Sequence, residues 1–199
     1  SDRKQKNALR RFLSMRGMGQ VVSVTVALIL MIVVVTLYNG NFVSKRNITE
    51  LLRQVAPILI IGIGQSYVLI TAGIDLSIGS VAGMSSKLSA ILMTKAGMHW
   101  APAVLITVAS CLVIGLINGT LVSRAKLPPF IATMGTMFIA RGIAQLAGRN
   151  TDGINAPFFR DLFYYGKFLE LYAPIWIALI LFLVFNFILS KTRTGRNIY

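Results

Sequence analysis

The stretch TAGIDLSIGS, residues 71–80, places a carboxylate and two serines between two long apolar runs. Its Asp75 is one of only six acidic residues in the chain. Other apolar runs contain the amides of Gln65 and Asn118 and the guanidinium of Arg141. Inside a membrane such side chains are costly unless they face a partner or a water-filled cavity. The chemistry they offer is hydrogen bonding to a polar molecule.

The sequence argues against several kinds of catalysis. It has no G-x-x-x-x-G-K-[ST] loop for phosphate and no G-x-S-x-G nucleophile elbow. Its single histidine, His99, stands beside Trp100 and outside any Cys/His pattern typical of a metal site. Hydrolysis by paired aspartates inside a membrane needs a second one near Asp75, and none is present. We therefore expect no catalytic residues, metal or cofactor.

The composition indicates that membrane-spanning helices position these polar residues. Of 199 residues, 55% are hydrophobic and 13% are charged, which is about half the charged fraction of a soluble domain. A closed β-barrel would show alternating polarity, whereas this chain has continuous apolar runs close to the ~20 residues that a helical span needs. We predict an all-α, polytopic helical bundle that forms one transmembrane domain over residues 1–199. Its six spans are expected at residues 20–38, 55–71, 76–94, 101–123, 130–148 and 172–190.

The net charge of +14 follows the same pattern. Lys and Arg gather in the connecting segments, above all before the first apolar run and after the last. With six spans, the segments on the N-terminal side of the membrane hold more of them than the opposite segments. The positive-inside rule then predicts that both ends are cytoplasmic. Basic residues so placed need no nucleic acid as a partner, and the lone Cys111 excludes a disulfide framework.

Three connecting segments carry specific expectations. Residues 39–54 predict a short interfacial helix capped by Asn47 or Thr49. Residues 149–171 are rich in Phe and Tyr, which suits an aromatic belt at the membrane surface and equally suits a docking surface for an external partner.

The third is the stretch 73–80, which predicts a helix end, a tight break and a helix start. Gly73 is expected to take the left-handed conformation, and Asp75 or Ser77 to cap the next helix. The break lies either at the cytoplasmic surface or within the membrane, where it must line protein or water. The pairs Gly79/Gly83 and Gly115/Gly119 predict close helix packing.

Three motifs in order resemble the permease subunit of bacterial ATP-binding-cassette (ABC) importers for monosaccharides. They are GIDLSIGS at 73–80, GLINGTLVSRAKLPPFIATMGTMFIARGIA at 115–144 and SKTRTGRNIY at 190–199. The resemblance extends over nearly the whole chain from about residue 40. Ribose, xylose and galactose importers belong to this family, and branched-chain amino-acid permeases are its more distant relatives.

The resemblance implies a multi-pass subunit of the bacterial inner membrane, with a cytoplasmic N-terminus, that moves a monosaccharide by alternating access. It implies as partners a second permease copy, a cytoplasmic ABC ATPase, a periplasmic sugar-binding protein and the lipid bilayer. ATP hydrolysis would then take place on a separate chain, and this subunit would not be an enzyme. Two alternatives stay open, a branched-chain amino-acid permease of the same superfamily and a non-transport membrane scaffold.

Family chains have about ten spans of ~20 residues each, so this chain looks truncated at its C-terminus. A second departure is Lys87, which falls mid-span in GMSSKLSA where a small or apolar residue is expected. Arg193 and Arg196 are expected to approach the ATPase, because the last motif leads into the coupling segment of the family. The substrate pathway is expected to draw amide, hydroxyl, aromatic and charged groups from Gln65, Asp75, Ser77, Asn118, Phe130, Thr133 and Arg141.

Overall fold

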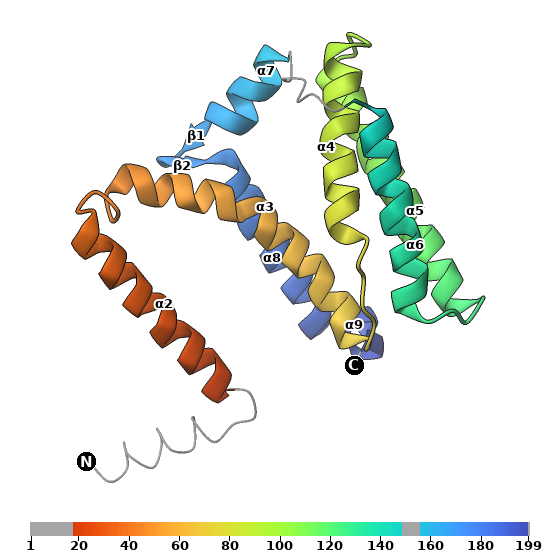
Figure 1. Ribbon diagram of the computed structural model, residues 1–199, viewed down its shortest axis with the longest axis horizontal. Coiled ribbons are helices and arrows are strands. Elements are labelled where there is room, and N and C mark those ends of the chain that lie inside the picture. The colour runs from red at the N-terminus through yellow and green to blue at the C-terminus, as the bar shows by residue number, and fades with distance from the viewer. Residues whose placement is uncertain (1–17, 149–155, 199) are drawn as a thin grey trace. The chain divides into compact units, whose positions relative to one another are not determined.

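The computed structural model describes residues 18–148 and 156–198, and helices dominate both ranges (Figure 1). The predicted basic segment before residue 18 and the first part of the predicted aromatic segment, 149–155, lie outside the described residues. The chain divides into two compact units between Leu51 and Leu52, and each is described by itself. Six long helices are α2 (Met18–Tyr38), α3 (Lys45–Ile70), α4 (Ile78–Thr94), α5 (Trp100–Ser123), α6 (Pro129–Leu146) and α8 (Ala173–Lys191).

These six helices coincide with the six predicted spans to within a few residues, except that α3 begins ten residues early. Four of them, α2, α3, α5 and α8, are long and apolar enough to cross a membrane. The other two fall short of that description for different reasons. Helix α4 has only 17 residues, and α6 contains the polar Arg141 and Gln145 among its 18.

In the first unit, α2 is predominantly apolar, carries no charged residue and has no buried residue. The predicted short helix over 39–54 is wrong, because residues 45–54 are the first turns of α3. The cap is Ser44, whose Oγ accepts a hydrogen bond from the Asn47 N–H at 3.3 Å. Asn47 instead donates through Nδ2 to the Phe42 carbonyl at 2.6 Å, and Thr49 donates to the Lys45 carbonyl inside the helix. A serine immediately before the helix therefore takes the role expected of Asn47 or Thr49.

In the second unit, α4, α5 and α6 pack against one another as a three-helix bundle. The buried core of this bundle is made of small or flexible side chains, such as Met84, Met93, Ala103 and Ala140. The large apolar side chains point outward, and Leu116 is 70% exposed. Small residues between helices and large ones outside are the arrangement of helices packed in lipid.

A second contact in this unit joins α3 to α8. The Tyr67 hydroxyl donates to the Phe185 carbonyl at 2.5 Å, and the rings of Tyr67 and Phe185 meet edge to face at 5.6 Å. The only buried residue of α8 is Ala178. Most of the surface of α8 is thus apolar and open within the described part of the chain.

Between α6 and α8 the described chain forms short elements: α7 (Pro157–Arg160), the π-helical η1 (Asp161–Tyr165), and a hairpin of β1 (Lys167–Phe168) with β2 (Leu171–Tyr172). Lys167 lies opposite Tyr172 in this antiparallel pair. The hairpin turn, Leu169–Glu170, has positive φ at both residues, 49° and 66°, as a two-residue hairpin loop requires. The chain then continues through α8 to the short helix α9 (Arg193–Ile198).

Candidate functional site

The loop 71–77 connects α3 to α4 and starts with a tight helix end. The Gly73 N–H donates to the Val68 carbonyl and the Ala72 N–H to the Leu69 carbonyl, both at 3.0 Å, which is the Schellman pattern. Ala72, with φ of 56°, takes the left-handed position predicted for Gly73. Gly73 is the next residue, and its backbone lies close to Val68. A Cβ on Gly73 would lie 3.1 Å from Val68 Cγ1. The glycine is needed for close approach, so the prediction was wrong about its role.

The Asp75 carboxylate fixes the entrance to α4. Its Oδ1 accepts hydrogen bonds from the Ser77 N–H at 2.7 Å and from the Ser77 hydroxyl at 2.6 Å. This is an Asx-type turn. Ser77 is the N-cap residue of α4, but its side chain accepts no hydrogen bond from the helix. Its hydroxyl donates to Asp75 and accepts from the Asn118 amide. Asp75 therefore holds the cap residue in place, and neither side chain accepts an N–H of the first helical turn as predicted.

Asn118 connects this turn to the two other helices of the bundle. Its Nδ2 donates to Ser77 Oγ at 3.1 Å, and its Oδ1 accepts from the Thr136 hydroxyl at 2.8 Å. Ser77, Asn118 and Thr136 are 2%, 7% and 5% exposed. We call Asp75, Ser77, Asn118, Thr133 and Thr136 the polar network. It joins the loop before α4 to α5 and α6 through buried polar atoms that have partners, as stability demands.

Thr133 attaches the loop backbone to α6. Its Oγ1 accepts from the Leu76 N–H at 3.2 Å, and it lies within donating distance of the Pro129 and Ile74 carbonyls, at 2.8 Å and 3.2 Å. Thr133 is four residues into α6, and Asn118 is five residues before the end of α5. The loop is thus recessed by about one helical turn, ~5 Å, from the ends of both helices. This recess favours the buried placement of the break, where irregular backbone lines protein.

Four members of the polar network were predicted from the sequence, and Thr136 was not. Thr136 lies three residues after Thr133, so the two share one face of α6, and that spacing was the signal available. Among the described residues the Asp75 carboxylate makes no ion pair. The network therefore consists of hydroxyl, amide and backbone groups around a single half-buried carboxylate.

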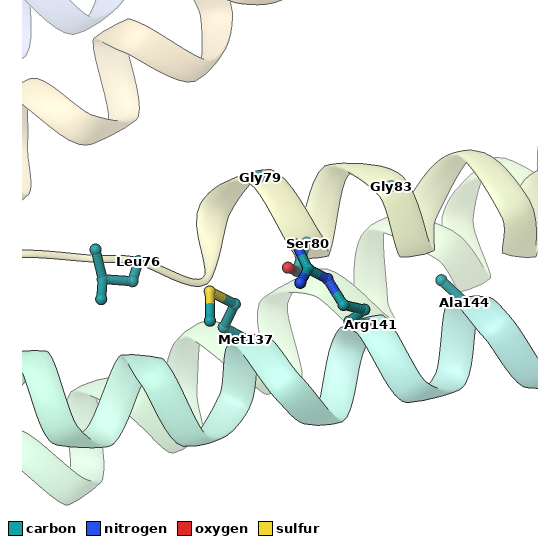
Figure 2. Close-up of a pocket in the computed structure, with 7 residues that line it drawn as sticks. All are labelled: Leu76, Gly79, Ser80, Gly83, Met137, Arg141 and Ala144. Atoms are coloured by element: carbon teal, nitrogen blue, oxygen red, sulfur yellow. The ribbon is translucent and has the colours of Figure 1, made fainter.

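A groove of about 330 Å³ extends between α4 and α6 from the end of the recessed loop. Figure 2 shows Arg141 reaching from α6 toward the turn of α4 that carries Ser80. Arg141 is exposed. The groove is lined by Leu76, Gly79, Ser80, Gly83, Met137, Arg141 and Ala144.

The predicted close packing through the glycine pairs is not made within the described chain. A Cβ built on Gly79, Gly83, Gly115 or Gly119 meets nothing within 4 Å. The face of α4 that contacts the bundle carries Met84 and Met93, and Gly79 and Gly83 fall beside that face. They form an open wall of the groove instead of a helix contact.

The remaining predicted residues lie apart from the polar network. Gln65 is on α3, and its buried Oε1 has no hydrogen-bond partner among the described residues. Phe130 is the second residue of α6 and is 49% exposed. Arg193 and Arg196 are exposed on α9, and Lys87 is half-buried on α4. Their assigned roles stay predictions.

The aromatic residues of the segment 156–172 pack largely on one another. Trp100 at the start of α5 stacks on Phe158 with ring centroids 5.8 Å apart. The Arg53 guanidinium lies over the rings of Tyr164 and Tyr172 at 4.2 Å and 4.8 Å, a cation–π geometry. Phe168 is 65% exposed. An aromatic belt and a docking surface both stay predictions for this segment.

Comparison with known proteins places these features in a family. The family described as branched-chain amino acid transport system / permease component matches residues 47–199. A ribose import permease protein of Bacillus subtilis is 32% identical over 92% of this chain and 57% of its own length. A ribose import permease protein of Haemophilus influenzae is 37% identical over 87% of this chain and 55% of its own length. A fructose import permease protein of Rhizobium meliloti is 34% identical over 80% of this chain and 47% of its own length.

The chain thus spans a little over half the length of the ribose import permeases that it matches. No solved structure matches it. The family match covers about three quarters of the chain and includes the polar network and the groove. The chain belongs to the family of permease components of the branched-chain amino acid transport system type.

Proposed function

We propose that this chain is the membrane-spanning permease subunit of an ABC importer that carries a monosaccharide across the bacterial inner membrane. The observation that carries the proposal is its similarity, along 92% of its length, to a protein named a ribose import permease. The fructose import permease supports the same substrate class. The exposed apolar sides of α2, α5 and α8 support a multi-pass membrane protein.

The described polar groups suit a neutral, hydroxylated solute. A sugar is recognised by amide, hydroxyl and aromatic groups around a cavity, and Gln65, Asn118 and Phe130 supply these types. A free amino acid carries an ammonium and a carboxylate, so its pathway needs a counter-charge for each. Arg141 in the groove offers a counter-charge for the carboxylate alone, and Asp75, which precedes the groove residue Leu76, already binds Ser77 through its Oδ1. We therefore prefer a sugar, with amino-acid transport as the second candidate because the family description names it.

The importer assignment brings partners with it. We propose a second permease copy, a periplasmic sugar-binding protein and a cytoplasmic ABC ATPase that supplies all ATP hydrolysis. The excess of Lys and Arg on the N-terminal side supports a cytoplasmic N-terminus. The exposed Arg193 and Arg196 on α9 are then available for the ATPase. Tight sugar affinity resides in the binding protein, so the permease needs only weak contacts along its path.

Transport in reconstituted vesicles tests the proposal. The full-length permease, its ATPase and its binding protein are reconstituted together, and uptake of labelled ribose, allose, fructose and leucine is measured with and without ATP. We expect ATP-dependent accumulation of a sugar and none by the permease alone. Accumulation of leucine without any sugar would establish the amino-acid alternative. Uphill uptake without the ATPase would contradict the importer assignment, and uptake of none of these solutes would support the scaffold alternative.

A further inference from the structure

Arg141 occupies a position that needs a polar environment. It is the thirteenth of 18 residues in α6, so its Cα lies ~8 Å from the nearer end of the helix at 1.5 Å per residue. Figure 2 shows its guanidinium turned back toward Met137, which is away from that nearer end. A side chain directed this way does not extend to the closer membrane surface. Among the described residues it makes no hydrogen bond or ion pair.

The cost of this arrangement disfavours contact with lipid tails. An arginine near the bilayer centre costs at least ~2.5 kcal/mol unless water or a polar partner solvates it. No described carboxylate forms an ion pair with it, and two of them have other partners: Asp75 binds Ser77, and Asp161 pairs with Arg160. The guanidinium therefore needs a solvating group from outside the described chain, and the groove is the space where that group sits.

The groove follows two facing helix stripes, and its polar side chains are Arg141 and Ser80 among small and apolar residues. On α6 the lining residues Met137, Arg141 and Ala144 are spaced by four and then three positions, so they share one face of the helix. On α4, Gly83 follows Gly79 by four positions and Ser80 by three, so these residues also share a face. The neighbouring α6 residues Phe138 and Ile139 are 57% and 60% exposed, which suits lipid. Large apolar residues thus cover one side of α6, while Arg141 stands on the groove side between Met137 and Ala144.

Size and chemistry define what the groove accepts. Its volume of about 330 Å³ lies at the lower end of small-molecule pockets, ~300–1,000 Å³. The Arg141 guanidinium offers five N–H donors and Ser80 a hydroxyl that donates and accepts. Gly79 and Gly83 leave the opposite wall open. Several donors beside open space match a solute that carries many hydroxyl acceptors. A guanidinium also binds anions, and the Arg141 substitutions described below distinguish the two kinds of occupant.

We propose that this groove is a water-filled wall of the solute pathway, where Arg141 and Ser80 hydrogen-bond the hydroxyls of a neutral polyol. The inference rests on the proposed function and adds to it the place and the contacts. Leu76 both lines the groove and donates its backbone N–H to Thr133. The recessed loop therefore fixes one end of the path.

Cysteine accessibility tests the water-filled groove in the full-length permease assembled with its ATPase and binding protein. Ser80→Cys and Gly83→Cys are made in a background free of other cysteines, with Phe138→Cys and Ile139→Cys as matched lipid-facing controls. A charged, membrane-impermeant methanethiosulfonate reacts with the hydrated thiolate. We expect the groove cysteines to react at least ~10-fold faster than the controls, and the transported sugar to slow them several-fold. Rates equal to the controls would overturn the proposal, and so would fast reaction that no transported sugar slows.

The same vesicles separate this inference from the proposed function. Sugar import by the cysteine-free parent together with inert groove cysteines would reject the groove alone. If no sugar were imported but the groove cysteines reacted fast, the proposed function would be rejected. The groove would then be water-filled but would not bind a transported polyol.

Substitutions at Arg141 identify the occupant. Arg141→Gln keeps neutral donors and should retain sugar uptake to within about tenfold at matched membrane abundance, the size expected for weakening one hydrogen bond. Arg141→Leu should lose more than Arg141→Gln. If the occupant were a carboxylate of another segment or an anionic lipid, Arg141→Lys would preserve uptake while Arg141→Gln abolished it, and the polyol would be excluded.

Discussion

The polar network and the groove are neighbours that share helix α6, and they differ in one respect. In the network, Ser77, Asn118 and Thr136 are at least nine-tenths buried and bonded to one another. In the groove, Arg141 is exposed and has no partner in the described chain. Polar residues in membrane helices can thus build the fold when their bonds are satisfied within the chain. They become candidates for solute contact when their hydrogen-bonding groups have no partner in the described chain.

The largest effect is expected in the network. Asn118→Leu removes both amide bonds, at ~0.5–1.5 kcal/mol for each. The Ser77 hydroxyl keeps Asp75, and the Thr136 hydroxyl keeps the Thr133 carbonyl at 3.1 Å. We expect a loss of about 1–3 kcal/mol in the free energy of unfolding. Thermal unfolding of the purified permease in detergent measures it, with Ile117→Val on the exposed side of α5 as the control.

The opposite result would erase the distinction between the two regions. If Asn118→Leu kept parental stability and lost sugar uptake, Asn118 would belong with Arg141 in the pathway.

Asp75 gives a sharper comparison, because its charge and its acceptor oxygen can be separated. Asp75→Asn keeps an acceptor for the Ser77 N–H and hydroxyl, so we expect nearly parental stability and uptake. Asp75→Ala removes the acceptor and should cost about 1–2 kcal/mol, the usual range for a lost cap-type bond. Uptake is measured at matched membrane abundance. Near-zero uptake by a stable Asp75→Asn variant would move Asp75 from the fold to the transport pathway.

Two glycines of the same region should respond with opposite signs and the smallest magnitudes. Gly73→Ala pushes a methyl group to 3.1 Å from Val68 Cγ1 and should destabilise the permease by about 1 kcal/mol. Gly83→Ala meets open space, so helix propensity should stabilise it by up to ~1 kcal/mol.

Sugar uptake distinguishes the two roles further. Gly83→Ala should lower uptake because its methyl group narrows the groove, while Gly115→Ala on α5, also in open space, is the matched control. Equal uptake by both variants would argue that the wall at Gly83 does not contact the solute.

The sequence was sufficient for the six helices, because each is an apolar run of nearly the right length. It was sufficient for Asp75, Ser77, Asn118 and Thr133 as a polar set, because such side chains are rare in apolar runs. It did not reveal how they pair, since Asn118 finds Ser77 forty-one positions away and only tertiary packing makes that contact.

Local details failed for a related reason. The left-handed residue is Ala72 and not Gly73. The glycine stands at 73 because the backbone there approaches Val68 closely, which the sequence does not reveal. The cap of α3 is Ser44 and not Asn47 or Thr49, because apolar periodicity does not mark where a helix begins upstream of its span. The open glycine pairs show that spacing alone does not identify the face that a helix packs.

The bond between Asn118 and Thr136 has a consequence for how the chain enters the membrane during synthesis. Helix α5 is among the helices long and apolar enough to cross a membrane, and α6, which contains Arg141 and Gln145, is not among them. Asn118 precedes Thr136 by eighteen residues, so the ribosome synthesises it first. Its amide can therefore already be in the bilayer when α6 inserts. We expect α6 to insert efficiently after α5 and poorly alone, and Asn118→Leu to reduce the benefit. An insertion assay with a glycosylation tag after α6 measures this, and efficient insertion of α6 alone would show that it needs no template.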